Sequence, residues 1–387
     1  MRRILALLMM LLPSSLAALE VRVHPGDVVY AYEVDPARGL YTVMLQNVAI
    51  VQKEGGGPVT LDSLEIQVVH GGQAVQTVVI PASDLEKSAK RLSALDAQGV
   101  LKLYDMHCQT SRYLEGIKIA SGRTLSPGTA LIVFGKPLLL LGLPSDGLTI
   151  VARGQDTDGR TVEARASLKV EDHRSPNVYT FPLAGTWYVG AGPNLHSHHR
   201  WAAMEEFAFD LVALGGDGKT HKGDGSHLDD YYSYGRDVLV VADGVVVEVA
   251  TEATEANERL RRADESEEDY EKRTVMAQNE LLAKSYKAPI GNYVVIRHAG
   301  GEFSHYAHLK QRSVKVKAGD TVKQGQPIGQ LGHTGNTTEP HLHFQLTDGP
   351  DPMYSRGVPI TFKNTTVEGL GFEGRPLQTG WIVTAKK

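Results

Sequence analysis

Short apolar segments separated by Gly, Asp and Pro recur along most of this chain, and they restrict the fold to one built mainly of β-strands. Between residues 19 and 172 these segments include VRVHPGDVVYAYEV, YTVMLQNVAIV, LEIQVVHGGQAVQTVVIP and LTIVARGQDTDGRTVEARASLKV. The stretch SDLEKSAKRLSALDAQGV is instead typical of a helix, with Ser83 as its N-cap and Gly99 as its stop. We predict an N-terminal β-sandwich-like domain at 19–172 that contains one helix.

The second half of the chain is also β-rich, and 387 residues suffice for two domains. The polar, proline-flanked stretch 173–182 is predicted to be a linker, and 183–362 a second, β-rich domain. The stretch 254–286 is dense in Glu, Arg, Lys, Ala and Leu, which favours a helical hairpin inserted between two strands. This insertion is either a solvated surface hairpin or a lid beside a cleft. Residues 363–387 are expected to form a C-terminal tail.

The first eighteen residues, MRRILALLMMLLPSSLAA, have the pattern of a secretory signal peptide. Arg2 and Arg3 supply a positive start, and small residues at 15–17 supply a cleavage site. The apolar run between them is shorter than the ~20 residues that cross a bilayer. Cys108 is the only cysteine, so no intramolecular disulfide can form, and no cysteine near the cleavage site offers a lipid anchor. We expect an exported protein, periplasmic or extracellular, without a membrane span after cleavage.

The charge of the chain argues against a nucleic-acid partner. The formal net charge is −5, and loss of Arg2 and Arg3 with the signal peptide would change it to −7. Nucleic-acid binding requires a clustered basic surface instead. A second apolar run at 130–144 is broken by Gly135 and Pro137, which predicts strands rather than a transmembrane helix. The sequence leaves the oligomeric state open.

Histidines are concentrated in the second half, where eleven of the fifteen fall between His196 and His343. In EPHLHFQL, at 339–346, His341 and His343 are two residues apart in an apolar run. Residues at this spacing point to one face of a strand, so Leu342 and Phe344 are predicted to face the core. Two imidazoles on one face can be aimed at one metal ion, or one at a metal ion and one at its bound water.

Two further patterns extend this histidine pair to a candidate metal site. Asp210, in the apolar strand EEFAFDLVAL, must be paired, hydrogen-bonded or metal-bound if it is buried. NLHSHHRW carries three histidines in a predicted loop, His196, His198 and His199. Nitrogen and oxygen donors without thiolate suit zinc, whereas calcium and magnesium prefer mostly oxygen. HYAHL adds His308, predicted to share a strand face with Tyr306, with His305 and Ala307 on the other face.

With these residues identified, the stretch 237–344 resembles the lysostaphin-type, or LytM-like, zinc metallopeptidases, which cut peptide crosslinks in bacterial cell walls. The resemblance is carried by VVADGVVVEV, GNYVVIRH, YAHL, VKAGDTVKQGQPIGQLGHTGNTTEPHLHF and, upstream, FAFDL. It covers about 180–362 and implies a β-rich, lysostaphin-type (duplicated hybrid motif) peptidase domain with one Zn²⁺ ion.

The resemblance also implies roles for individual residues. His343 and Asp210 correspond to zinc ligands, and His308 and His341 to catalytic residues that flank the bound water. The remaining ligand is a histidine upstream of the aspartate, most often four residues before it, where this chain has Glu206. Relatives with a longer spacing exist, so we select His199, eleven residues before Asp210, with His196 and His198 as alternatives.

Elementary chemistry agrees with these roles. Zinc lowers the pKa of bound water to about 7 and polarises a carbonyl. A neutral imidazole can take the proton and deliver it to the leaving amine, and a second imidazole can stabilise the oxyanion. Either His308 or His341 can fill either role.

We therefore predict an exported zinc metalloendopeptidase whose substrate is the stem peptides or crosslinks of peptidoglycan. Two alternatives remain. The chain could be a catalytically silent, zinc-binding regulator of cell-wall hydrolases, or a peptidase that acts on peptides outside the wall. The N-terminal domain carries no obvious wall-binding repeat.

Overall fold

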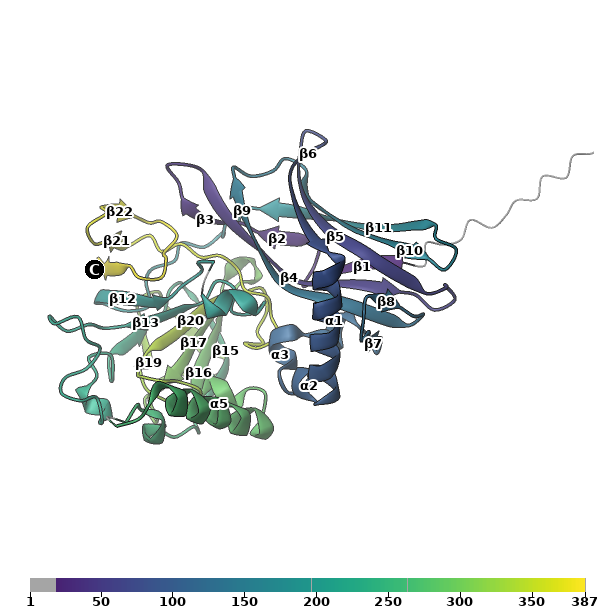
Figure 1. Ribbon diagram of the computed structural model, residues 1–387. Coiled ribbons are helices and arrows are strands. Elements are labelled where there is room, and N and C mark those ends of the chain that lie inside the picture. Colours follow the sequence, from purple (N-terminus) through teal and green to yellow (C-terminus); the bar gives the residue numbers. More distant parts are fainter. Residues whose placement is uncertain (1–18, 196, 263, 387) are drawn as a thin grey trace, which may run out of the picture.

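The computed structural model describes residues 19–195, 197–262 and 264–386, and the protein is mainly β, as predicted (Figure 1). The predicted signal peptide at 1–18 lies outside the described residues. Among the described residues, no helix has both the length and the apolar character to cross a membrane.

Two sheets form the N-terminal domain, and side chains from both make one hydrophobic core, as in a β-sandwich. The first sheet has the order β1-β4-β9-β7, with β3 also paired to β4. Its strands are β1 (Leu19–His24), β3 (Tyr32–Asp35), β4 (Leu40–Gln52), β7 (Lys118–Ile119) and β9 (Thr129–Leu141). The second has the order β2-β11-β10-β5-β6, with β8 paired to β5. Its strands are β2 (Val28–Tyr30), β5 (Val59–His70), β6 (Gln73–Pro81), β8 (Thr124–Leu125), β10 (Gly147–Asp156) and β11 (Thr161–Glu171).

The predicted helix is present as α1 (Ala82–Ala97), but Ser83 is not its N-cap. Strand β6 runs directly into the helix, so Pro81 occupies the N-cap position and no side chain caps it. The helix ends just before Gly99, whose φ of +75° suits glycine at a helix end. Three short helices that were not predicted follow: α2 (Val100–Leu103), α3 (Asp105–Cys108) and α4 (Thr110–Tyr113).

Ten strands of the second domain form one sheet, in the order β18-β15-β16-β17-β20-β13-β12-β23-β21-β22. They are β12 (Gly185–Ala191), β13 (Phe209–Val212), β15 (Gly244–Ala250), β16 (Asn292–Arg297), β17 (Phe303–Leu309), β18 (Thr321–Val322), β20 (Leu342–Thr347), β21 (Thr365–Val367), β22 (Phe372–Glu373) and β23 (Ile382–Ala385). A separate ribbon pairs β14 (Asp237–Leu239) with β19 (Pro327–Gln330). Because β17, β20 and β13 are neighbours, side chains far apart in the sequence meet on one face.

Two expectations for this domain are wrong. Described residues within 363–387 are not a free tail, because β23 pairs with β12 and β21 pairs with β23. The described part of the insertion at 254–286 holds a single α-helix, α5 (Glu267–Lys284), rather than a hairpin of two. The Ser266 hydroxyl caps α5 by accepting a hydrogen bond from the backbone N–H of Asp269.

The segment predicted as the linker is fixed to the second domain by one buried carboxylate, that of Glu302. His173 Nε2 lies 2.8 Å from Glu302 Oε1, and three further side chains, those of Ser175, Asn177 and Tyr179, donate to Oε2. Burial opposes ionisation of Glu302, but these hydrogen bonds outweigh burial and lower the pKa of the carboxyl to about 2.

The Glu302 cluster is expected to make the protein sensitive to acid. Because the pKa of Glu302 is lower in the folded state, its contribution to stability is complete above about pH 4.5 and is lost as pH falls toward 2. The free energy of unfolding of the wild type should therefore decrease more steeply between pH 5 and 3 than that of Glu302→Gln, by at most about 3 kcal/mol in total. Urea unfolding at several pH values measures this difference, and parallel pH profiles would contradict it.

Candidate active site

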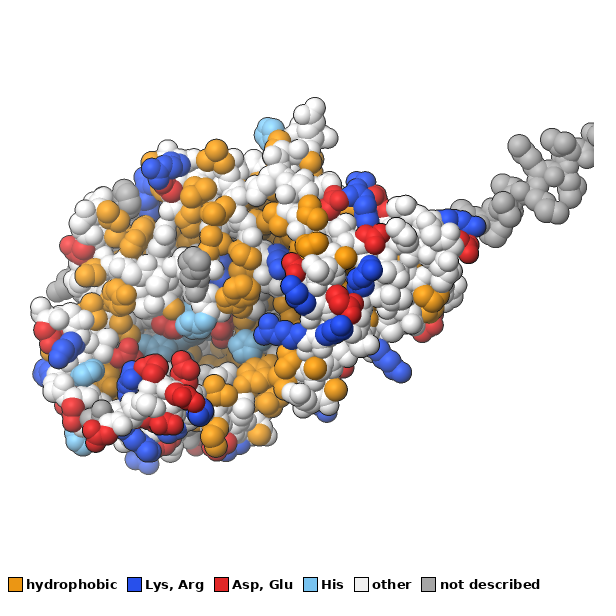
Figure 2. All heavy atoms as spheres, viewed as in Figure 1, with side chains coloured by type: hydrophobic (Ala, Val, Ile, Leu, Met, Phe, Trp, Pro, Cys, Tyr) orange, Lys and Arg blue, Asp and Glu red, His pale blue; other side chains and the backbone are white. Residues whose placement is uncertain are grey.

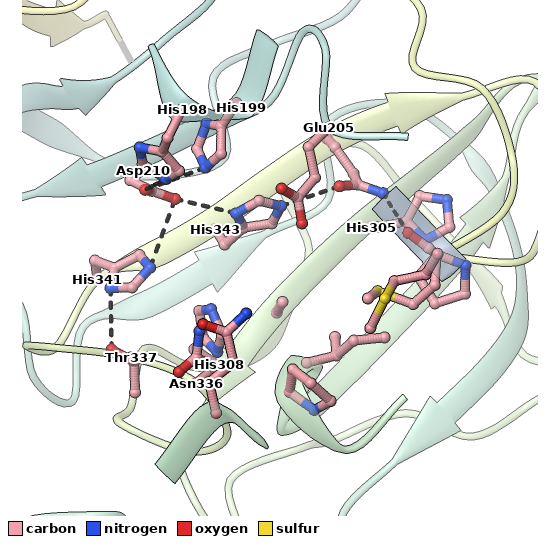
Figure 3. Close-up of a pocket in the computed structure, with 18 of the residues that line it drawn as sticks. His198, His199, Glu205, Asp210, His305, His308, Asn336, Thr337, His341 and His343 are labelled. Atoms are coloured by element: carbon pink, nitrogen blue, oxygen red, sulfur yellow. Dashed lines mark hydrogen bonds and ion pairs between the residues drawn. The ribbon is translucent and has the colours of Figure 1, made fainter. Parts of the chain in front are cut away.

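Asp210 is the centre of a histidine cluster (Figure 3). Its Oδ1 atom lies 3.0 Å from His343 Nδ1 and 3.5 Å from His341 Nε2. Its Oδ2 atom lies 3.3 Å from His199 Nε2 and 3.7 Å from His198 Nε2. A single carboxylate thus has four imidazole nitrogens within hydrogen-bonding or ion-pair range.

Strand register explains how Asp210 and His343 meet. They are direct neighbours on the antiparallel strands β13 and β20, so their side chains lie on the same face of the sheet. His341 precedes β20 and lies on that face too, whereas Leu342 and Phe344 are buried in the core behind it. The alternation predicted from HLH is therefore correct.

The upstream histidines come from a 3₁₀ turn, His198–Trp201. The side chain of His199 is 3% exposed, whereas that of His198 is 73% exposed. Nitrogens of both, with a carboxylate oxygen of Asp210, lie within 4.8 Å of one another, which is compact enough to hold one metal ion. The third alternative, His196, lies outside the described residues.

Glu206 lies four residues before Asp210, where the resembled metallopeptidases most often have a ligand histidine. Its side chain is turned away from the cluster. It is buried against Arg200, with Glu206 Oε1 and Arg200 Nη2 separated by 3.5 Å. A carboxylate engaged with a buried guanidinium is not available as a ligand, so the departure from the common spacing has a structural explanation.

His308 reaches the cluster through an unusual backbone conformation. Its φ is +59°, in the left-handed region, which interrupts the alternation of β17. The prediction that His308 shares a face with Tyr306 is wrong: Tyr306 packs in the core, whereas His308 lines the cleft together with His305 and Ala307. The expectation that His305 faces away is also wrong: because Tyr306 takes the core-facing position of β17, its neighbour His305 lines the cleft, where its Nε2 atom lies 2.6 Å from Thr347 Oγ1.

His308 and His341 are oriented alike, by hydrogen bonds to backbone carbonyls. His308 Nδ1 lies 2.8 Å from the oxygen of Thr334, and His341 Nδ1 lies 2.8 Å from that of Glu339. A carbonyl only accepts, so each Nδ1 carries a proton, and each ring has a lone pair on Nε2 whenever it is neutral. The two ring centroids are 4.7 Å apart. Both imidazoles are thereby prepared to accept a proton.

Electrostatics in the cluster favour a positive charge beside Asp210. Burial disfavours ionised Asp210, but the histidines, led by His199 and His341, hold its pKa well below the usual range. Burial likewise disfavours charged His343, but Asp210 raises the pKa of His343 to about 9. A carboxylate that stabilises a positive charge on a neighbouring imidazole this strongly would also stabilise a divalent cation, and the nitrogen and oxygen donors of the cluster fit zinc. In contrast, burial and repulsion from His341 and His343 hold the pKa of His308 well below its usual value.

The opposite wall of the cleft is built by two segments that are distant in sequence. Gln278 and Leu282 come from α5, and Met106 and His107 come from α3 of the N-terminal domain. In Figure 2 the histidines are visible in the hollow between these parts.

The α3 segment is anchored beside the cleft. Met106 is 1% exposed and belongs to one hydrophobic cluster with Leu282 and Met353 of the second domain. The Tyr104 hydroxyl donates to Asn279 Oδ1 of α5, and Arg112 stacks on the ring of Tyr354, 4.5 Å from its centroid. Sequence reasoning missed this wall, because nothing local in 104–112 signals a contact with residues more than 170 positions away.

Glu205 was also missed. Its side chain lies in the cleft beside His343 (Figure 3). Burial opposes its ionisation, but the surrounding histidines, His343 first, lower the pKa of the carboxyl. A signal was present in the sequence, since a carboxylate five residues before Asp210 in an apolar segment requires the same explanation as Asp210 itself.

Comparison with known proteins identifies a family match over part of the chain. Residues 225–355 match Peptidase family M23. Among curated proteins, the peptidoglycan DD-endopeptidases ShyC and ShyB of Vibrio cholerae are 52% identical over 62 residues and 46% identical over 99 residues. These matches cover 16% and 25% of this chain, and only 14% and 23% of the relatives. The cell division protein DipM of Caulobacter vibrioides is 39% identical over 75 residues, which cover 19% of this chain and 12% of DipM.

Two solved structures are also similar to part of the chain. The catalytic domain of the M23 protein EnpA from Enterococcus faecalis has 18% identity and a TM-score of 0.24, covering 48% of this chain and 90% of that domain. The catalytic domain of lysostaphin from Staphylococcus simulans has 19% identity and a TM-score of 0.23, covering 47% of this chain and 88% of that domain.

Proposed function

We propose that this chain, which carries a Peptidase family M23 domain at residues 225–355, is an exported zinc endopeptidase that hydrolyses the peptide crosslinks of peptidoglycan. One observation carries the proposal: Asp210 gathers histidines that are separated by more than 130 residues, beside two further imidazoles poised to accept protons. Relatives named as peptidoglycan DD-endopeptidases support the substrate class. Export is proposed from the pattern of residues 1–18.

In this proposal His199, Asp210 and His343 hold the zinc ion. His199 is preferred over His198 because it is buried and its nitrogen lies closer to Asp210, 3.3 Å against 3.7 Å. When bound, zinc supplies a Lewis acid and a water molecule of lowered pKa. Two imidazoles and one carboxylate leave a position open for that water.

His308 and His341 handle the proton. Each ring is held by a carbonyl at Nδ1, so its Nε2 can take a proton from the attacking water. The same imidazole, once protonated, is a donor for the leaving amine. The other imidazole can donate from Nε2 to the oxyanion in its protonated form. The 4.7 Å separation of the rings allows both to act on one scissile bond.

A digest of purified peptidoglycan by residues 19–387 tests the proposal. Crosslinked muropeptides should be converted to uncrosslinked ones, a zinc chelator should stop this conversion, and added zinc should restore it. Mass spectrometry of the products identifies the bond that is cut, and the His343→Ala protein is the matched control. Intact crosslinks, from a protein that holds one zinc ion, would overturn the proposal in favour of a regulator or of a peptidase with substrates outside the wall.

A further inference from the structure

The turn that carries His198 and His199 lies between the two domains. Its histidines face Asp210, whereas the backbone carbonyl of Arg200 and the ring of Trp201, the two residues that complete the turn, contact the N-terminal domain. Gln46 Nε2, from β4 of the N-terminal domain, donates to the backbone carbonyl of Arg200 at 2.9 Å, and both residues are buried. This amide therefore holds the main chain of the residue that follows His199.

Trp201 contacts the same point of the N-terminal sheet. Its ring packs on Gly135 of β9, where φ is +50° and an added Cβ would lie 2.3 Å from Trp201 Cε3. Gln46 and Gly135 are opposite each other, because β4 and β9 pair at Leu45 with Lys136 and at Asn47 with Phe134. At this one position the sheet thus provides both a hydrogen-bond donor for the turn and a glycine against which the Trp201 ring packs.

The core-facing pattern of β4 changes at this position. Val43 and Leu45 face the core of the sandwich before Gln46, and Val48 and Ile50 face it afterwards. With strict alternation along the strand, the core-facing residues after Leu45 would also have been odd-numbered. Counted from Val43 and Leu45, Gln46 lies on the face away from the sandwich core, where its amide reaches the Arg200 carbonyl.

The segment leading to Asp210 is attached to the same surface. The guanidinium of Arg200 is buried between the carboxylate of Glu206 and the ring of Phe207, 5.1 Å from its centroid. The Phe207 ring packs against Tyr32 of the N-terminal domain, with 5.8 Å between centroids. Glu206 and Phe207 precede Asp210 by only four and three residues. The turn that carries the upstream histidines and the segment that leads to Asp210 therefore both contact the N-terminal domain.

We infer that Gln46 is a positioning residue for the metal site, and that the N-terminal domain fixes the turn His198–Trp201 so that its imidazoles face Asp210. A buried ion pair such as Arg200–Glu206 contributes little net stability. Without the amide of Gln46, the Arg200 carbonyl loses its donor from the other domain, and the turn loses its fixed orientation. The inference relies on the proposed function only in that these residues bind a divalent cation.

Binding of zinc and of cobalt(II) alone, without substrate, tests the inference. Gln46→Met keeps the length and volume of the side chain but removes the donor. We expect 10- to 100-fold weaker metal binding, as for other groups that orient a ligand, and an altered cobalt(II) absorption spectrum. Competition with a chromophoric chelator measures the affinity. Should Gln46→Met not fold, Trp201→Ala, at a side chain that is half exposed, should show the same two changes.

Gln52→Met is the matched control. Gln52 is a buried residue of the same strand, and its Nε2 likewise donates to a backbone carbonyl, that of Gly57, at 2.6 Å. This control should bind metal as the wild type does. Wild-type affinity and spectrum in folded Gln46→Met would overturn the inference, as would a wild type that binds neither metal. A wild type that binds metal but does not cut peptidoglycan would overturn the proposed function, while the metal measurements on Gln46→Met would still decide the inference.

Discussion

His343→Ala should lose its bound zinc and lose at least about 10³-fold in kcat/KM, since a Lewis acid contributes several kcal/mol to such a reaction. His343 lies directly opposite Asp210 in the strand pair β13–β20, with its Nδ1 atom 3.0 Å from the carboxylate. With alanine at position 343, the remaining candidate zinc ligands would be one carboxylate and the histidines of a single turn. The zinc content of the purified protein and its rate of crosslink cleavage, measured on the same sample, give the two results.

His305→Ala is the control for zinc content. His305 is also a buried histidine that lines the cleft, but it is hydrogen-bonded to Thr347 rather than to Asp210. This variant should retain one zinc ion per chain. A His343→Ala protein that still carries one equivalent of zinc would show that His343 is not a ligand.

His308→Ala should keep its zinc and lose about 10²- to 10⁴-fold in kcat, the range for removal of a general acid or base. His308 is held by the Thr334 carbonyl at Nδ1, and its Nε2 carries the lone pair in the cleft. The expected result is therefore a large fall in kcat at an unchanged zinc content. This separation distinguishes a proton-transfer role from a ligand role.

Tyr306→Phe provides a comparison within the same strand. The Tyr306 hydroxyl accepts a hydrogen bond from the backbone N–H of Val241 in the core, on the face of β17 away from the cleft. Its removal should change stability and leave kcat within a few fold of the wild type. Full activity in His308→Ala would remove His308 from the mechanism and leave His341 as the proton acceptor.

The features that the sequence could predict are those set by local periodicity. Apolar segments bounded by Gly, Asp and Pro indicated a mainly β fold, and the two-residue spacing of His341 and His343 placed both on one strand face. Asp210 was recognisable as well, because a carboxylate in an apolar strand requires a partner.

The features that the sequence could not predict depend on backbone conformation or on distant contacts. A positive φ at His308 moves its side chain to the cleft face of β17, and the residue type does not predict this conformation. The role of Glu206 became clear only with Arg200 beside it. The short strands β21 and β23 are too brief for a periodic signal and are stabilised by pairing with each other and with β12.

Met106 packs in one hydrophobic cluster with Leu282 and Met353, and this packing limits how such chains can recombine during evolution. The region that matches Peptidase family M23 is not self-contained in this chain, because part of the cleft wall comes from a segment more than a hundred residues before residue 225. A transplanted copy without α3 would expose an apolar socket to water next to its histidines. We therefore expect helix α3 and the insertion α5 to be inherited together, and substitutions on one to be matched by substitutions on the other.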